Sequence, residues 1–368
     1  MASSSICCIF NYAPHYRKEI FLHMEDGLGC DFYFGDKLDT PIKKLDYSLF
    51  KRPVHELRCT FIKGKYYLAG SLRLCFKAYS CYIVEGQPKD ISSWLVGLTC
   101  RLLGKKVYTW THGKFVKDRW LVRTIKGLYF RIFNGHFLYG NYARELMIGR
   151  GFKPEKLHVI YNSLAYSSQG LVRIGLQQTE VFRSHFNNDD PVLIFIGRLE
   201  PVKKLPMILR LQRRLLDAGS PVNVVFVGDG IERNALLSLA KELALEDRAW
   251  FYGACYDEKR IGELLFNASL CVSPGNIGLT VIHSLGYGTP AITHNNFYLQ
   301  MPEFEAIKPG ITGDFFQEND EDDLFRVTRE WLAQHPEKSK DLLEACYEVV
   351  DEYYNPDYQI AVFKSVLR

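Results

Sequence analysis

The chain has 368 residues, of which 47% are hydrophobic and 24% charged, and its formal net charge is +4 at pH 7. These fractions exclude a disordered or coiled-coil protein and are typical of a globular one that is long enough for two domains. No apolar run approaches the roughly 20 residues of a membrane-spanning helix.

The first half of the chain alternates short apolar runs, which predict β-strands, with segments whose apolar residues recur at helical spacing. The run at residues 6–10 has no basic region before it, so we expect a first strand there and not a signal peptide. The predicted strands are residues 6–10, 31–34, 65–69, 78–84, 106–109, 136–139 and 158–161, and the predicted helices are residues 17–27, 91–103, 117–133 and 142–151.

The polar stretch at residues 166–178 has no strong periodicity, so we expect an interdomain linker there. Beyond it the alternation is clearer and predicts an α/β fold of parallel βαβ units, which bind ligands at the carboxyl ends of their strands. The predicted strands of this half are residues 192–196, 222–227, 249–252 and 270–273, and the predicted helices are residues 205–218, 231–245, 257–267 and those after 322, with a break at 355–356.

The ten cysteines are scattered, with no Cys-x-x-Cys pair and no Cys/His cluster at zinc spacing. Several lie inside apolar runs, where cysteine behaves as a small hydrophobic residue. We therefore expect a protein of the reducing cytoplasm without a structural metal.

The segment at residues 271–293 has the pattern of a strand, a glycine-bearing turn, a helix that Gly278 opens, and a second strand. The start of a helix offers unpaired backbone N–H groups and the positive end of a dipole, which favour phosphate or diphosphate. An ordinary strand–helix connection would give the same pattern.

Two cations follow the predicted strand at residues 192–196. Arg198 and Lys203 lie in the run GRLEPVKK, where a diphosphate at the carboxyl end of the strand would meet both. The alternative is two solvated cations in a loop. The nearby sequence Gly228-Asp229-Gly230 indicates a tight turn, which more often reflects close packing than ligand contact.

His112 follows another predicted strand and precedes Gly113. A neutral histidine in a cleft can bind a sugar hydroxyl or transfer a proton, although a histidine in such a place is more often structural.

The stretch from Lys114 to Arg131 interleaves basic with aromatic and aliphatic residues. This composition favours an anionic membrane surface. We expect no nucleic-acid partner, which is the weaker anionic candidate. A helix whose aromatic side chains pack on its own sheet is the structural alternative.

Taken in order, the runs GRLEPVKK, FVGDG, SPGNIGLTVIHSLGYGTPAITH and PEFEAIKPGITGDFF resemble family 4 glycosyltransferases, in particular those of bacterial surface polysaccharides and lipopolysaccharides. The resemblance covers residues 191–331. It implies the GT-B fold, in which two Rossmann-like domains face a central cleft and the last helix crosses back to the first domain. The implied domains are residues 1–167 with 352–368, which bind the acceptor, and 168–351, which bind the nucleotide sugar.

The resemblance also implies roles for single residues. His112, Arg198 and Lys203 would be catalytic, the two cations because they neutralise the donor diphosphate without a metal. The family usually has two glutamates around the glycine turn, and their positions hold Gly275 and His283 here, which indicates either a variant site or lost activity. The implied donor-binding residues are Gly197, Gly278, Leu279, Thr280, His283, as a ribose contact, and Glu305.

We therefore expect a glycosyltransferase that moves a sugar from a nucleotide-sugar donor to a glycan or lipid-linked glycan acceptor in cell-surface polysaccharide synthesis. It would retain the anomeric configuration, need no cofactor or metal, and favour a UDP-sugar over a GDP- or dTDP-sugar. It would be cytoplasmic and peripheral on the inner face of the membrane. The alternatives are a non-catalytic nucleotide-sugar or glycan-binding protein and a GT-B hydrolase or epimerase of nucleotide sugars.

Overall fold

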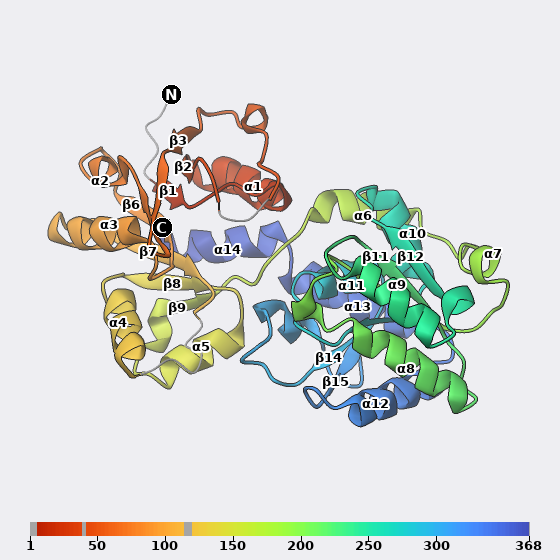
Figure 1. Cartoon of the computed structure of the whole chain (residues 1–368). Helices are drawn as coiled ribbons and strands as arrows, with labels where there is room; N and C mark the ends of the chain where they lie inside the picture. The colour runs from red at the N-terminus through yellow and green to blue at the C-terminus, as the bar shows by residue number, and fades with distance from the viewer. Residues whose placement is uncertain (1–5, 39–41, 114–119, 368) are drawn as a thin grey trace. The chain divides into compact units, whose positions relative to one another are not determined.

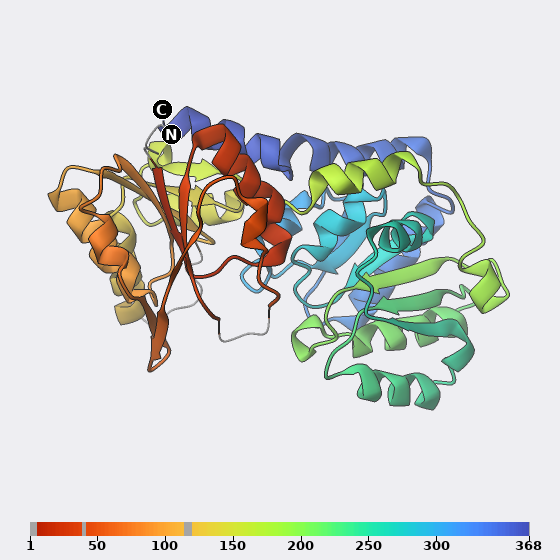
Figure 2. The same cartoon turned by 90° about the horizontal axis from the view of Figure 1, so that it is seen from above.

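The computed structural model describes residues 6–38, 42–113 and 120–367. The chain divides into two compact units. Unit 1 contains Met1–Ala165 and Tyr353–Arg368, and unit 2 contains Tyr166–Glu352. In Figures 1 and 2, unit 1 runs from red to yellow and includes the last blue helix, and unit 2 runs from yellow-green to blue.

Unit 1 is built on a seven-stranded sheet with the order β3-β2-β1-β6-β7-β8-β9. Every neighbouring pair in it is parallel. Two further strands form an antiparallel hairpin. The strands are β1 Ile6–Phe10, β2 Asp31–Gly35, β3 His55–Leu57, β4 Cys59–Ile62, β5 Lys65–Leu68, β6 Cys81–Glu85, β7 Lys106–Thr111, β8 Gly135–Leu138 and β9 Leu157–Val159.

Helices cover both faces of this sheet, because successive side chains of a strand point to opposite sides. Cys7 and Ile9 of β1 belong to one hydrophobic core, and Cys8 and Phe10 belong to the other. The first core contains side chains of α2, α3, α4 and α5, and the second contains side chains of α1 and α14. These helices are α1 Lys18–Leu28, α2 Ser71–Leu74, α3 Ile91–Leu102, α4 Trp120–Arg131, α5 Asn141–Ile148 and α14 Pro356–Leu367.

The last helix, α14, packs in unit 1 although the rest of the C-terminal half belongs to unit 2. Phe363 of α14 lies with its ring centroid 4.4 Å from that of Phe137 and 5.6 Å from that of Trp110. The expected return of the last helix to the first domain is therefore confirmed.

Unit 2 is built on a six-stranded parallel sheet with the order β12-β11-β10-β13-β14-β15. The order reverses between β10 and β13, as in a doubly wound sheet that binds ligands at this point. Its strands are β10 Val192–Ile196, β11 Asn223–Val227, β12 Ala249–Gly253, β13 Leu270–Ser273, β14 Ala291–His294 and β15 Gly313–Phe316.

Two groups of helices pack on this sheet. Helix α8 contacts α9 and α12, while α6 contacts α10 and α11. Right-handed crossovers place these two groups on opposite faces. The helices are α6 Tyr166–Ile174, α7 Arg183–Phe186, α8 Pro206–Asp217, α9 Arg233–Glu242, α10 Glu258–Asn267, α11 Thr280–Gly286, α12 Glu321–Gln334 and α13 Lys340–Tyr353. The short 3-10 helices are η1 His15–Arg17, η2 Tyr47–Leu49, η3 Pro154–Lys156, η4 Pro201–Lys203, η5 Glu246–Arg248 and η6 Pro302–Ala306.

The boundary between the two units falls at the start of the predicted linker, between Ala165 and Tyr166, but most of residues 166–178 is helical, because α6 occupies Tyr166–Ile174. The side chain of Gln169 is buried and donates to Glu258 of α10, so a tertiary contact stabilises this polar helix. The predicted strand at residues 65–69 exists, but it pairs in the hairpin with β4. None of the described helices is both long enough and apolar enough to span a bilayer.

Candidate functional site

The turns that follow β10 and β11 lie directly against each other at the carboxyl edge of the unit 2 sheet. A Cβ atom on Gly228 would lie 1.9 Å from the carbonyl oxygen of Gly197, and one on Gly230 would lie 2.4 Å from that of Leu199. Gly228 also has a φ of 149°, which disfavours any other residue. The Gly-Asp-Gly sequence is therefore required for close packing.

Arg198 follows β10 and lies at the rim of this edge. Its side chain is 66% exposed, and its guanidinium forms an ion pair of 2.8 Å with Glu200. An ion pair this exposed contributes little to stability. The guanidinium can therefore exchange this partner for an anionic ligand at small cost.

Lys203 is the last residue of η4, and its side chain points to the loop after β13. Its Nζ donates to Oδ1 and to the carbonyl oxygen of Asn276, at 2.9 and 2.6 Å. Burial, together with the smaller effect of the Arg198 charge, lowers the pKa of Lys203 to about 8 against the opposing effect of Glu200. The amine is thus charged at neutral pH and lies beside the predicted diphosphate turn.

Gly275 stands where the resemblance to family 4 glycosyltransferases implies a glutamate. It lies directly against the backbone of η4. A Cβ atom here would lie 2.0 Å from the carbonyl oxygen of Val202 and 2.6 Å from Cα of Lys203. The N–H of Gly275 also donates to the carbonyl oxygen of Lys203 at 2.9 Å. No side chain fits at position 275 in this conformation, so the η4 turn excludes a glutamate.

The turn before α11 presents backbone donors. Among the described residues, the N–H groups of Gly278, Leu279 and Thr280 find no hydrogen-bond acceptor. The Thr280 hydroxyl donates to the carbonyl oxygen of Ile196 at 2.8 Å, which ties the turn to the end of β10. Because α11 has only seven residues, we assign most of the positive potential to Arg198 and Lys203 and not to the helix dipole.

A buried glutamine that the sequence analysis missed holds this loop in place. Gln300 accepts the N–H of Ile277 at 2.9 Å and donates to Thr293 Oγ1 and to the carbonyl oxygen of His294, at 2.8 and 3.0 Å. A single amide therefore fixes the loop after β13 to the end of β14.

His283 lies on α11, one turn beyond Thr280, and bonds to a carboxylate. Its Nε2 lies 2.8 Å from Oε1 of Glu258. The same oxygen accepts the Tyr287 hydroxyl at 2.7 Å and Gln169 Nε2 at 3.0 Å. Burial alone would raise the pKa of Glu258, but the bonds from His283, Tyr287 and Gln169 lower it to about 2. Glu258 is therefore ionised, and His283 carries its proton on Nε2.

The two remaining predicted site residues are His112 and Glu305. His112 belongs to unit 1, where it follows β7 and packs its ring 4.6 Å from that of Tyr139. Glu305 lies half-buried in η6 of unit 2. Its neighbour Glu303 is only 1% exposed, and the charge of Glu303 raises the pKa of Lys203. Glu303 is thus the carboxylate of η6 whose charge acts on Lys203.

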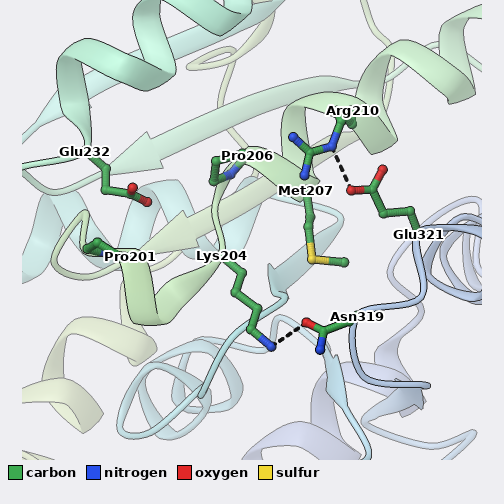
Figure 3. A pocket seen from close by; sticks show the side chains of 8 residues that line it. All are labelled: Pro201, Lys204, Pro206, Met207, Arg210, Glu232, Asn319 and Glu321. Atoms are coloured by element: carbon green, nitrogen blue, oxygen red, sulfur yellow. Dashed lines mark hydrogen bonds and ion pairs between the residues drawn. The ribbon is translucent and has the colours of Figure 1, made fainter.

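A separate cavity of about 370 Å³ opens behind η4, and Figure 3 shows its lining. Lys204 donates to Asn319 and Arg210 to Glu321 across it, both at 2.7 Å. Lys204 also forms an ion pair with Glu318, so both cations of the cavity are paired with carboxylates. None of the predicted site residues lines the cavity, which is formed by Pro201, Lys204, Pro206, Met207, Arg210, Glu232, Asn319 and Glu321.

Residues 177–349 match the family model described as Glycosyl transferases group 1. This stretch of the chain resembles that family. The match covers the β10, β11 and β13 turns together with η4, η6 and α11, so every predicted donor-binding residue lies inside the matched stretch.

Curated relatives resemble part of the chain. D-inositol 3-phosphate glycosyltransferase of Nocardia farcinica (strain IFM 10152) is 30% identical over 134 residues, which are 34% of this chain and 29% of that protein. Glycogen synthase 2 of Nitrosococcus oceani is 29% identical over 185 residues, which are 47% of this chain and 36% of that protein. The matched stretches therefore span only 29% and 36% of these relatives.

Solved structures resemble the whole chain. The lipopolysaccharide outer core galactosyltransferase WaaB in its apo form has a TM-score of 0.71 at 14% identity, over 98% of each chain. Anabaena Alr3699/HepE in complex with UDP has a TM-score of 0.73 at 14% identity, over 99% of each chain. The chain thus has the GT-B fold, with two Rossmann-like units, as the sequence predicted.

Proposed function

We propose that the chain is a glycosyltransferase that moves a sugar from a nucleotide-sugar donor to a glycan or lipid-linked glycan acceptor, in the synthesis of a cell-surface polysaccharide. The observation that carries the proposal is the placement of Lys203 Nζ against the loop that leads to Gly278, inside the stretch that matches the family model. With Arg198 at the rim, this turn supplies two cations and three backbone donors to a diphosphate.

A UDP-sugar is the donor that we favour over a GDP- or dTDP-sugar. HepE, whose fold resembles that of the chain over its whole length, has been solved in complex with UDP and with UDP-glucose. Competition assays with UDP, GDP and dTDP test this choice, and UDP should inhibit at the lowest concentration.

In the proposed reaction, the bond between the anomeric carbon and the leaving diphosphate breaks while charge develops on the phosphate oxygens. Arg198 and Lys203 neutralise that charge, which lowers the barrier electrostatically without a metal. His112 would contact the donor sugar near the reacting carbon, and Glu305 would bind the donor.

We propose that the leaving phosphate accepts the proton of the acceptor hydroxyl, so that the anomeric configuration is retained. NMR of the product tests this step, and an inverted configuration would contradict it.

We further propose that unit 1 docks the enzyme, as a cytoplasmic protein, on the inner face of an anionic membrane. Helices α3 and α4 are neighbours, since Arg101 of α3 donates to the carbonyl oxygen of Arg131 in α4. The exposed apolar side chains of α3 recur every three or four residues, and those of α4 begin with the adjacent Trp120 and Leu121 and then recur at the same spacing. These residues, together the α3–α4 surface, are Leu95, Leu98 and Leu102 of α3 and Trp120, Leu121, Ile125 and Leu128 of α4.

The expected membrane-docking segment from Lys114 to Arg131 is supported only in its described part, because residues 114–119 lie outside the described residues. Trp120 is 70% exposed, whereas Tyr129 and Phe130 are buried in the core of unit 1. The aromatic residues of this segment therefore divide between the α3–α4 surface and the core.

Co-sedimentation with vesicles of phosphatidylcholine and phosphatidylglycerol tests the docking. The double variant Arg123→Glu, Lys126→Glu should lose most of its binding to these vesicles, because each basic residue near an anionic surface contributes about 1 kcal/mol. The matched control Lys241→Glu, Lys340→Glu makes the same charge change in unit 2 and should bind as the wild type does. Equal binding by both double variants would contradict the docking.

A further inference from the structure

The carboxylate that the family resemblance expects at position 283 is absent, yet a carboxylate from another helix lies beside His283. Glu258 is the first residue of α10, directly after β12, and its Oε1 lies 2.8 Å from His283 Nε2. A carboxylate therefore lies next to position 283, although it comes from a residue 25 positions earlier in the chain.

All the bonds to Glu258 fall on one oxygen. His283, Tyr287 and Gln169 donate to Oε1, whereas Oε2 accepts no hydrogen bond from any described residue. The side chain is 30% exposed, so Oε2 is open to a ligand. Donors from α6 and α11 thus orient an ionised carboxylate whose second oxygen can accept two hydroxyl hydrogens.

The position of Glu258 Oε2 follows from the helices around it, α10 and α11. Helix α10 begins at the carboxyl edge of the unit 2 sheet, and His283 lies one turn along α11 from the Gly278–Thr280 turn. If the diphosphate lies at that turn, as the proposed function requires, the next group of a nucleotide is its ribose. We propose that Glu258 is the ribose-binding residue, with Oε2 accepting the ribose hydroxyls, and that His283 is a positioning residue that orients it.

This assignment rests on the proposed function and changes one expectation of the sequence analysis. His283 was expected to accept from the ribose with its ring nitrogen, but Nε2 is committed to Glu258. The alternative role of Glu258 is purely structural, as a clamp that joins α6, α10 and α11. A clamp would affect stability without affecting the choice between ribose and deoxyribose.

Calorimetric titration with UDP and with 2′-deoxy-UDP separates the two roles. The wild type should bind UDP about tenfold more tightly, because 2′-deoxy-UDP lacks one hydroxyl that donates to a charged acceptor. Glu258→Gln should reduce this ratio to about twofold or less, and His283→Ala should reduce it partly. The matched control is Glu263→Gln on the same helix, whose carboxylate bonds to Arg260 and Thr179 and which should keep the wild-type ratio.

The outcomes are distinct. If the wild type binds UDP and 2′-deoxy-UDP equally well, the assignment is overturned. This outcome needs no variant, so the test remains valid even if Glu258→Gln does not fold. An unchanged ratio in folded Glu258→Gln would also overturn it, and would leave the proposed function standing because UDP still binds. If UDP, GDP and ADP all fail to bind the wild type at millimolar concentration, the proposed function fails and the ribose assignment fails with it.

Discussion

Gly275→Ala is the substitution whose effect the structure defines most sharply. The added Cβ would lie 2.0 Å from the carbonyl oxygen of Val202. An ordinary contact begins at 3.4 Å, so the η4 backbone would have to retreat by about 1.4 Å. That movement would break the 2.9 Å bond from the Gly275 N–H to Lys203 and pull Lys203 Nζ away from Asn276.

The loss in the free energy of unfolding has two causes. Forcing one methyl group into a closely packed site costs about 1–3 kcal/mol, and a lost hydrogen bond costs about 1 kcal/mol. A total of roughly 3 kcal/mol lowers the melting temperature of a unit of this size by about 6–12 °C. Affinity for a nucleoside diphosphate should fall as well, because Lys203 moves.

Differential scanning calorimetry measures this effect, with Gly286→Ala as the matched control. Gly286 lies in α11, and a Cβ there would meet no atom within 4 Å. Alanine favours a helix by about 1 kcal/mol over glycine, so the control should melt at or above the wild-type temperature. If Gly275→Ala melts within about 1 °C of the wild type, the close approach of η4 to Gly275 is wrong.

Three further predictions concern the proposed site. Lys203→Met should lower sugar transfer by about 100-fold or more, whereas Lys204→Met, whose amine bonds to Glu318 and Asn319, should keep most activity in the same assay. Burial lowers the pKa of Lys203 to about 8, so the amine loses its charge as the pH rises from 7 to 9. Calorimetry should show weaker UDP binding across that range, and Lys203→Arg should abolish the dependence. His112→Ala should reduce transfer strongly but leave the Kd of free UDP unchanged, because His112 belongs to unit 1; a large loss of UDP affinity would contradict its proposed contact with the sugar.

The strands β10 to β14 of unit 2 could be predicted because a parallel strand covered on both faces is a continuous apolar run, as in Val192–Ile196, whereas β15 was not predicted. Helix α6 could not, because its apolar residues Leu171 and Ile174 are exposed, while its buried anchor, Gln169, contacts Glu258 from 89 residues away. No local periodicity records such a contact.

Some residues of the site could likewise be predicted from the sequence and others could not. Arg198 and Lys203 could be proposed from the sequence because they follow a recognisable strand within eight positions of its last residue, Ile196. Glu258 and Gln300 could not, because each acts through a bond to a residue 23 to 25 positions away. The replacement at Gly275 was visible in the sequence, but its cause, the backbone of η4, appears only in three dimensions.

The most direct test of the central claim is a thermal-shift panel of UDP-, GDP- and dTDP-sugars, run in EDTA with the wild type and with Lys203→Met. A ligand present at 100 times its Kd stabilises the folded state by about 2.7 kcal/mol, so a bound donor should raise the melting temperature by several degrees. We predict that a UDP-sugar does so for the wild type and not for Lys203→Met. Failure of every nucleotide sugar to shift the wild type at millimolar concentration would contradict a donor site at the Gly278 turn.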